Sequence, residues 1–154
     1  MIDAIDIKIL NMLQEKGRTK RNVMAEAVGL SLPSLSERLK KLEERNIIEG
    51  YYAKVNRKTF HFDLMAFITV IMSTSKKYNE LGKHVEETPE ILECHAVLGE
   101  GSHILKVLVK DTESLENLLS KVQSWNGVIR TSTSFVLSTI KETTKINLLN
   151  EGEK

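Results

Sequence analysis

Hydroxyl and cationic side chains recur between Ser34 and Arg45, at spacings that leave an apolar stripe between them. Hydroxyls and cations can donate hydrogen bonds to base edges in a major groove and can pair with phosphate oxygens. The stretch supplies Ser34, Ser36, Arg38, Lys40, Lys41 and Arg45. Its chemistry is therefore that of nucleic-acid contact, provided that one helix presents these side chains together.

The elements that must position these side chains are two short helices on either side of a glycine. Leu35, Leu39 and Leu42 recur at i, i+4 and i+7, which predicts a helix with one apolar stripe. A second apolar face precedes Gly29 and consists of Val23, Met24, Ala27 and Val28. The short gap between the two patterns is typical of a helix-turn-helix. The alternative is an ordinary helical hairpin whose charged residues are only solvated.

Capping residues indicate where the helices begin. Asp3 predicts a first helix that runs to about Lys16, which completes a three-helix domain. The helix that carries the polar side chains has two candidate starts. Either Ser31 is its N-cap, or Ser34 forms a capping box with Glu37.

The residues after the third helix predict a short β-ribbon, or wing. Ile47–Val55 is largely apolar and contains a glycine. Lys54, Arg57 and Lys58 would then reach the backbone of a nucleic acid. Phe60–Phe62 is interpreted as a connector that docks on a neighbouring element.

The second half of the chain predicts an α+β fold. Met65–Met72 is apolar at nearly every position, which is typical of a strand buried on both faces. The elements expected after it are a helix at Tyr78–Glu87, strands at Ile91–Leu98 and Ile104–Val109, a helix from Asp111 or Thr112 to Trp125, and a long strand at Val128–Ile140. This order is that of the ferredoxin-like βαββαβ arrangement.

Two helices cover only one face of a four-stranded sheet. Because Met65–Met72 indicates that the other face is also buried, we expect a second copy of the chain to cover it. The expected assembly is a homodimer with two-fold symmetry through the sheets. Such a dimer suits a helix-turn-helix, since two copies read two half-sites on one duplex.

Composition separates a basic N-terminal part from an acidic remainder. Net charge is +1, yet residues 1–62 hold 12 Lys/Arg against 8 Asp/Glu, and residues 63–154 hold 10 against 13. Only the first part is suited to phosphates. With one cysteine, no apparent signal peptide and no apolar run long enough to span a membrane, the expected location is the cytoplasm.

Enzymatic chemistry finds little support in the sequence. The four histidines are scattered, with no metal-ligand spacing among them or with Cys94. Gly99-Glu100-Gly101 lacks the remaining glycines and the strand-to-helix setting of a dinucleotide loop. We therefore expect no catalytic residues, no metal and no cofactor.

Many short motifs in order make the chain resemble the Lrp/AsnC, or feast/famine, transcriptional regulators of bacteria and archaea. The resemblance covers essentially the whole chain. The motifs are Ile5-Asp6, Ile9-Leu10, Gly17-Arg18, Val28–Ser31, Arg38–Glu43, Gly50-Tyr51, Pro89–His95, Leu105–Val107, Gly127-Val128 and Val136–Thr144.

The resemblance implies a sequence-specific regulator that binds double-stranded DNA, forms dimers and often octamers, and responds to an amino acid or related metabolite. In the helix that carries the polar side chains, it implies base reading by Ser34, Ser36, Glu37 and Arg38. Phosphate contacts would come from Lys20, Lys40 and Lys41, with Arg21, Arg45 and Lys54 as further candidates. Glu37 stands where relatives often carry Arg, and it can either accept from a cytosine amino group or repel phosphate.

The implied effector site is the turn after the second sheet strand. Its candidate residues are Ala96, Leu98, Gly99, Glu100, Gly101, Ser102, His103 and Ser134. Amino-acid-responsive relatives commonly read Gly-Asp-x-Asp-Tyr here, whereas this chain has Gly-Glu-Gly-Ser-His. Ser102 replaces the second acid, and Glu100 is the candidate to take over its role toward an amino group. Ser134 also stands where the family often has a larger residue, so we expect an altered ligand preference. The alternative is a plain tight turn with an exposed acid.

These patterns together predict four segments. They are a helix-turn-helix domain at 1–50, a wing or linker at 51–63, a ferredoxin-like effector and oligomerisation domain at 64–145, and a tail at 146–154. The alternative function is a metabolite-binding oligomer whose DNA binding is effector-independent or architectural.

Overall fold

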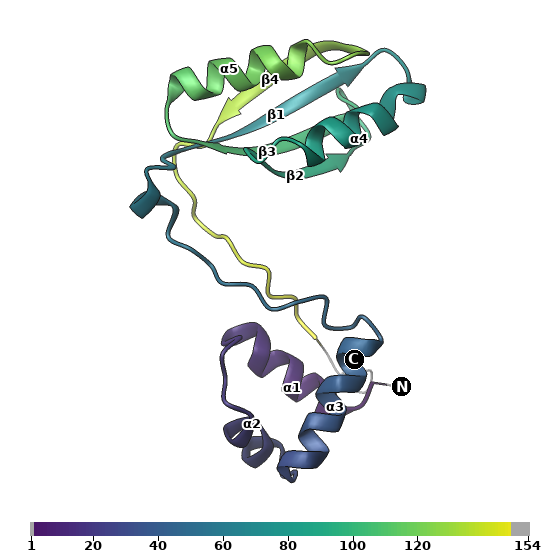
Figure 1. Ribbon diagram of the computed structural model, residues 1–154, viewed down its shortest axis with the longest axis vertical. Coiled ribbons are helices and arrows are strands. Elements are labelled where there is room, and N and C mark those ends of the chain that lie inside the picture. The colour runs from purple at the N-terminus through teal and green to yellow at the C-terminus, as the bar shows by residue number, and fades with distance from the viewer. Residues whose placement is uncertain (1, 149–154) are drawn as a thin grey trace. The chain divides into compact units, whose positions relative to one another are not determined.

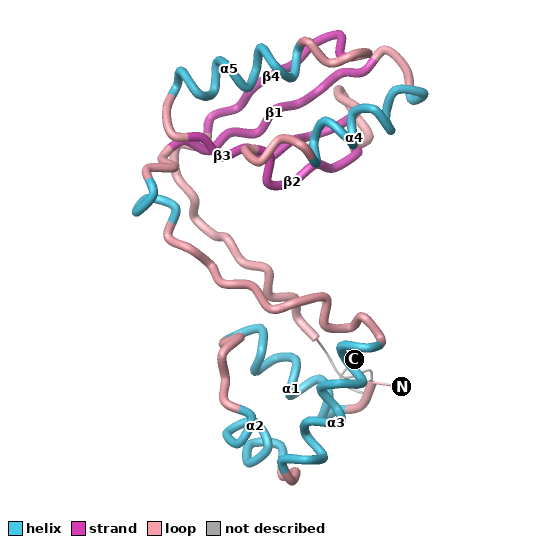
Figure 2. Tube along the Cα trace, in the orientation of Figure 1, coloured by secondary structure: helices cyan, strands magenta, loops and turns pink. Residues whose placement is uncertain are grey.

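In a computed structural model, which describes residues 2–148, the chain forms two compact units. The first, called the helical unit, contains the residues up to Lys54 and those from Lys141 onward. The second, called the sheet unit, is Val55–Ile140. Two separate passages of the chain therefore join the units. Figures 1 and 2 draw them as loop, except for a short 3-10 helix, η1 (Arg57–Phe60), in the first passage.

The helical unit consists of α1 (Ala4–Glu15), α2 (Arg21–Val28) and α3 (Leu32–Glu44), drawn in Figure 1. Gly29 ends α2 in the left-handed conformation, with φ of 69°. Ser31 caps α3, because its hydroxyl accepts the backbone N–H of Ser34, so the first of the two expected starts is confirmed. The core of the unit consists of Ile9, Met24, Ala25, Leu35, Leu39 and Leu42.

The expected β-ribbon at Ile47–Val55 is wrong, since the structure assigns no strand between α3 and Leu64. The backbone N–H groups of Ile47 and Ile48 both donate to Leu42 O, at 2.9 and 3.2 Å. Both side chains pack against the helical core. These residues therefore close the C-terminus of α3 instead of opening a strand.

Residues 141–148 are fastened to the helical unit by polar contacts. The Gln14 amide donates to Ile146 O at 3.1 Å and accepts from Ile146 N–H at 2.8 Å. Lys145 pairs with Glu15 at 2.6 Å, and Lys54 pairs with Glu142 at 2.8 Å. Residues 149–154 of the expected tail lie outside the described residues.

The sheet unit confirms the ferredoxin-like prediction. Its elements are β1 (Leu64–Met72), α4 (Tyr78–Glu86), β2 (Ile91–Ala96), β3 (His103–Val109), α5 (Thr112–Gln123) and β4 (Val128–Phe135). The strand order is β2-β3-β1-β4, and every neighbouring pair is antiparallel. In Figure 1, α4 and α5 lie on the same face of this sheet.

The last strand is shorter than expected, because β4 ends at Phe135 and not at Ile140. Phe135 pairs with Ala66 near the start of β1, and Val136 N–H donates to Met65 O at 3.0 Å. Among the described residues, the structure gives no pairing with β1 after Val136. Leu137 and Ile140 are consequently exposed.

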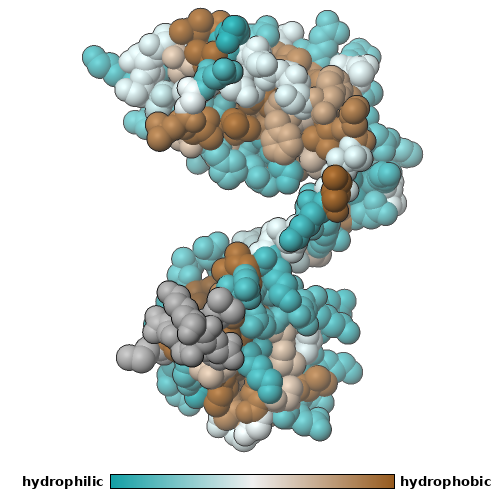
Figure 3. Space-filling view, turned by 180° about the vertical axis from the view of Figure 1, so that it is seen from behind, coloured by the Kyte–Doolittle hydropathy of each residue, from teal (hydrophilic) through white to brown (hydrophobic). Residues whose placement is uncertain are grey.

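Only one face of β1 is fully covered within the chain. Ala66, Ile68 and Val70 are completely buried beneath the helices, whereas Phe67 on the other face is 40% exposed. We call the side that bears Phe67 the open face. In Figure 3 hydrophobic surface is visible on the sheet unit, interspersed with polar groups. Among the described residues, no helix combines the length and apolar character needed to cross a bilayer.

Candidate nucleic-acid interface and effector turn

The side of α3 that points away from the helical core carries two ion pairs. Lys41 Nζ lies 2.7 Å from Glu37 Oε1, and Lys40 Nζ lies 3.6 Å from Glu44 Oε1. All four side chains are more than 60% exposed. The Lys41 hydrogen bond lowers the pKa of the Glu37 carboxyl. Exposed pairs of this kind are worth little, so a phosphate can replace either carboxylate as the lysine's partner.

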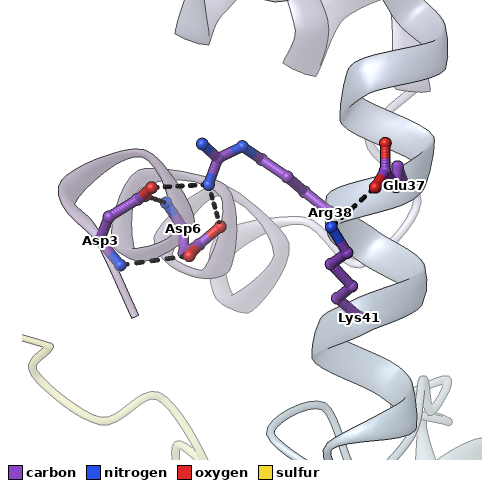
Figure 4. A network of polar contacts seen from close by, with 5 residues as sticks. All are labelled: Asp3, Asp6, Glu37, Arg38 and Lys41. Carbon is purple, nitrogen blue, oxygen red and sulfur yellow. Dashed lines mark hydrogen bonds and ion pairs between the residues drawn. The ribbon is translucent and has the colours of Figure 1, made fainter. Parts of the chain in front are cut away.

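Arg38 occupies a different environment, shown in Figure 4. Its Nη1 donates to Asp3 Oδ2 at 2.7 Å and to Asp6 Oδ1 at 2.8 Å. The two aspartates also cap α1 reciprocally, since each accepts the other's backbone N–H. The hydrogen bond from the Asp6 N–H, and then that from Arg38, lower the pKa of the Asp3 carboxyl. The structure thus directs Arg38 toward α1, although the sequence had suggested a base contact.

The remaining interface candidates lie at the ends of helices or beyond them. Ser34 Oγ is 2.8 Å from Ser31 Oγ in the first turn of α3, and Ser36 is half-buried. Lys20 and Arg21 begin α2, while Arg45 is the C-cap of α3 and Lys54 pairs with Glu142. A pocket of about 430 Å3 lies beside α3 and is lined by Asp3, Asp6, Leu30, Ser34, Glu37, Arg38, Lys41, Leu42 and Arg45.

Two partners of α3 escaped the sequence interpretation. Asp6 accepts from Arg38, and an acid at this position of a capping box does offer a carboxylate to neighbouring cations. Tyr51 OH donates to Glu43 Oε1 at 2.9 Å. Burial, followed by the nearby Glu43 carboxylate, raises the pKa of Tyr51 to about 12. Tyr51 therefore fastens the segment after α3 to that helix.

The candidate effector turn joins β2 to β3 and closes against β1. Val97 N–H donates to Ser102 O at 3.0 Å across the turn. Ser102 is anchored twice to Val70 O, through its N–H at 2.9 Å and its hydroxyl at 3.1 Å. A Cβ built on Gly101 would lie 2.4 Å from Thr69 Cγ2, so the turn touches β1 there and a side chain at Gly101 would require Thr69 or the turn to move.

The structure distributes the effector candidates over different surroundings. Leu98 and Glu100 are exposed at the tip of the turn, and Gly99 has φ of 135°, which favours glycine. Ser134 pairs with Phe67 and so lies on the open face. His103 pairs with Val70 and Ala96, on the side covered by the helices.

Thr69 is the contact of this site that the sequence interpretation missed. Its side chain meets the turn at Gly101, and its backbone pairs with Ile104 and Ser132. It lies on the open face, as do Phe67 and Ser134. The available signal was that Thr69 is the one polar residue in the apolar run Met65–Met72.

His103 is buried at the base of the turn, with 7% of its surface exposed. Its ring meets Tyr78 edge to face at 4.5 Å, and Nδ1 lies 3.0 Å from Ser102 Oγ. Burial lowers the pKa of this imidazole below its ordinary value of 6.5. The neutral ring is therefore part of the packing between α4 and the effector turn.

Acidification should destabilise the sheet unit through His103. As the pH falls through about 6.5, the unfolded chain takes up this proton before the folded chain does, so stability decreases toward lower pH. Thermal unfolding followed by Trp125 fluorescence should give a lower Tm at about pH 5.5 than at about pH 7.5. His103→Phe should reduce that pH dependence, whereas the exposed His61→Gln should retain it. Equal pH profiles for all three proteins would contradict a role for His103.

No group of three or more His, Cys, Asp or Glu side chains that could hold a metal occurs among the described residues. The residues described above instead form two separate groups. Arg38, Glu37 and Lys41 form one cluster on α3, and Gly101, Ser102 and Thr69 form the other.

Comparison with known proteins agrees with this two-part architecture. A family model described as the Lrp/AsnC ligand binding domain matches residues 65–146, and one described as winged helix-turn-helix DNA-binding matches residues 2–49. The chain is 33% identical over 146 residues to an HTH-type transcriptional regulator of Pyrococcus furiosus, covering 95% of this chain and 96% of that protein. It is 34% identical over 145 residues to the leucine-responsive regulatory protein of Haemophilus influenzae, covering 92% and 87%.

Solved structures of similar proteins extend the agreement to three dimensions. A transcriptional regulator from Neisseria meningitidis in complex with L-methionine has a TM-score of 0.90 and 34% identity, covering 96% of this chain and 97% of that one. A feast or famine regulatory protein from M. tuberculosis complexed with L-methionine has a TM-score of 0.88 and 27% identity, covering 95% and 99%. The chain therefore belongs to the Lrp/AsnC family of DNA-binding transcriptional regulators, which combine a winged helix-turn-helix with a ferredoxin-like ligand-binding domain.

Proposed function

We propose that this regulator reads duplex DNA with α3 and that an amino acid of the methionine type, bound at the Gly99–His103 turn, changes its assembly or DNA affinity. The working form is a homodimer through the open face, which assembles further up to an octamer. Its location is the cytoplasm, where it meets DNA. The observation that carries the proposal is the effector turn, which is closed onto β1 with no room for a side chain at Gly101.

The exposed side of α3 supports the DNA-reading part. Glu37, Lys40 and Lys41 lie on the face away from the buried leucines, where they can enter a major groove. Lys40 and Lys41 hold their carboxylate partners in exposed pairs, which a phosphate can displace. Lys40 and Lys41 can therefore bind phosphates without breaking any buried ion pair of α3.

The effector part is supported by the chemistry of the turn and by two relatives in complex with L-methionine. Gly99 and Gly101 leave backbone N–H groups accessible to a carboxylate, because neither carries a side chain. Glu100 is exposed beside them and offers a carboxylate to an α-amino group. Both charged ends of a free amino acid thus find a partner of opposite polarity.

The open face supports the dimer. Phe67 is 40% exposed there, and its diagonal neighbours Ile104 and Leu108, on either side of its register partner Lys106 on β3, are only partly buried. Beside them Lys106 pairs with Glu93 at 2.9 Å. A second copy of the same face would cover the apolar side chains, as closed two-fold association requires.

A direct test measures DNA binding and effector binding on the same protein. Duplexes selected from a random-sequence pool by the chain itself should be bound more tightly than shuffled duplexes, by fluorescence anisotropy. L-Methionine should bind by calorimetry and change either that affinity or the mass measured by light scattering. Failure to select any sequence would contradict the DNA-reading part, whereas DNA binding without a response to any of the twenty amino acids would contradict the effector part.

Lys41→Gln should weaken binding to all duplexes alike. A lost phosphate contact reduces the slope of log affinity against log salt by about one without altering sequence preference. The matched control is Lys121→Gln, which removes an exposed lysine from α5 in the sheet unit. Its salt slope should equal that of the unaltered chain. An unchanged slope for Lys41→Gln would remove this lysine from the interface.

A further inference from the structure

We propose that Arg38 is a positioning residue: its guanidinium locks the DNA-reading helix α3 to the N-terminal cap of α1 and does not itself read a base. This inference rests on the proposed function, because it concerns the helix assigned to DNA. It separates the polar residues of α3 into two groups. Arg38 fixes where the helix lies, and the exposed side chains Glu37, Lys40 and Lys41 meet the DNA.

The first argument is the geometry of the contact. One nitrogen of Arg38 bridges two carboxylates, Asp3 and Asp6, at 2.7 and 2.8 Å. Figure 4 shows the Arg38 side chain extending from α3 to these aspartates, while Glu37 and Lys41 bond to each other along α3. Hydrogen bonds between charged groups are short and directional, so they fix the relation of one helix to the other.

The second argument is the burial of Asp6. Its surface is only 7% exposed, and its partner Arg38 has 30% of its side chain exposed. If Arg38 turned toward DNA, it would leave the Asp6 carboxylate buried without its cation, which is strongly unfavourable. The exposed pair of Lys41 and Glu37 carries no such penalty. Breaking the Arg38–Asp6 pair costs more free energy than breaking the Lys41–Glu37 pair. Lys41 is therefore the side chain that turns to DNA, and Arg38 remains bound to Asp6.

The third argument is the place of Arg38 on the helix. It lies three residues after Leu35, four before Leu42 and next to Leu39, all of which are buried. Its Cβ is therefore at the margin of the apolar stripe. From there the long side chain runs along the flank of α3 toward α1, and it lines the wall of the pocket beside that helix.

The decisive comparison is between Arg38→Gln and Asp6→Asn in the full chain. Asn keeps the shape of Asp and an oxygen for the Asp3 N–H, while it removes the more buried of the two charges that hold Arg38. A positioning role predicts that both substitutions weaken binding to selected duplexes by about ten- to hundredfold. Both should weaken every sequence equally and leave the salt slope unchanged, because no base or phosphate contact is lost.

Each other role of Arg38 gives a different result. A base-reading Arg38 predicts that only Arg38→Gln loses preference at one base pair, while Asp6→Asn retains affinity. A phosphate contact predicts a lower salt slope for Arg38→Gln alone. A purely structural role predicts lower melting temperatures with unchanged affinity at a temperature where circular dichroism shows the variants folded. Any of these three results would overturn the inference.

The double variant and a control complete the design. Combining Arg38→Gln with Asp6→Asn should weaken binding no further than either single change, because both remove one contact. Asp111→Asn replaces the N-cap aspartate of α5 in the sheet unit and should leave DNA affinity unchanged. Failure of the unaltered chain to select DNA would contradict the proposed function and this role together, whereas loss confined to Arg38→Gln would contradict this role alone.

Discussion

Leu35→Ala should unfold the helical unit while the sheet unit stays folded. Leu35 is completely buried at the start of α3, in a core of six buried side chains. Truncating a buried leucine costs about 2–5 kcal/mol, because a cavity remains. A three-helix unit has a total stability of the same order, so DNA binding should be lost.

Two probes distinguish the units in this measurement. Trp125, the only tryptophan, lies in the sheet unit, where it is buried and its ring stacks on His84 at 5.1 Å. Its fluorescence should therefore report the sheet unit alone, whereas circular dichroism at 222 nm reports the helices of both units. For Leu35→Ala the dichroism should decrease at low temperature, with the fluorescence transition unchanged.

The matched control is Leu118→Ala in α5. Leu118 is 4% exposed in the core of the sheet unit. This substitution should lower the fluorescence transition and leave DNA binding by the folded protein intact. Parallel shifts of both probes in both variants would show that the two units unfold together, contrary to their separate cores.

The spacing of apolar residues predicted the helices and strands well, because the buried side chains of each element recur with its structural period. The stripe of Leu35, Leu39 and Leu42 on α3 is buried as expected, and Gly29 ends α2 in the left-handed conformation. The βαββαβ order followed from the alternation of strand and helix patterns. In each case the information is local, since one face of each element must be apolar.

Long-range partners could not be predicted in the same way. Ile47 and Ile48 are β-branched residues of the type found in strands. They nevertheless cap the C-terminus of α3, because Leu42 O accepts both of their N–H groups. Arg38 is of the residue type that most often contacts bases. Its side chain is nevertheless bound by Asp3 and Asp6, which are more than 30 residues away in the sequence. Such contacts depend on the packing of α1 against α3, which no pattern within α3 contains.

The effector turn shows the same limit. Its glycines were recognised from the sequence, but the reason for Gly101 is Thr69 on β1, 32 residues earlier. The register of β1 with β3 and β4 also places Ser134 on the open face and His103 on the opposite side. Strand pairing therefore decided which candidates share a surface.

Gly101→Ala should abolish the response to L-methionine without abolishing DNA binding. The new Cβ would lie 2.4 Å from Thr69 Cγ2, closer than real Cβ contacts, so something must shift. Because Thr69 lies in β1 between β3 and β4, we expect the turn to move away from β1. That shift would break the anchor of Ser102 on Val70 O and displace the N–H groups proposed to bind the effector carboxylate. Calorimetry should show methionine affinity reduced by at least about tenfold, the equivalent of one charge-assisted hydrogen bond.

A second substitution tests the cause, because Thr69→Ser removes the colliding methyl group and keeps the hydroxyl. The nearest remaining contact of the new Cβ is then Val70 O at 3.4 Å, which is tolerable. Gly101→Ala with Thr69→Ser should therefore regain much of the methionine affinity. Gly82→Ala is the matched control, since nothing lies within 4 Å of its Cβ position in α4, and there alanine should stabilise the helix by about 0.5–1 kcal/mol. If Gly101→Ala bound methionine normally, the turn could not be the effector site, because a displaced turn cannot keep the same backbone donors in place.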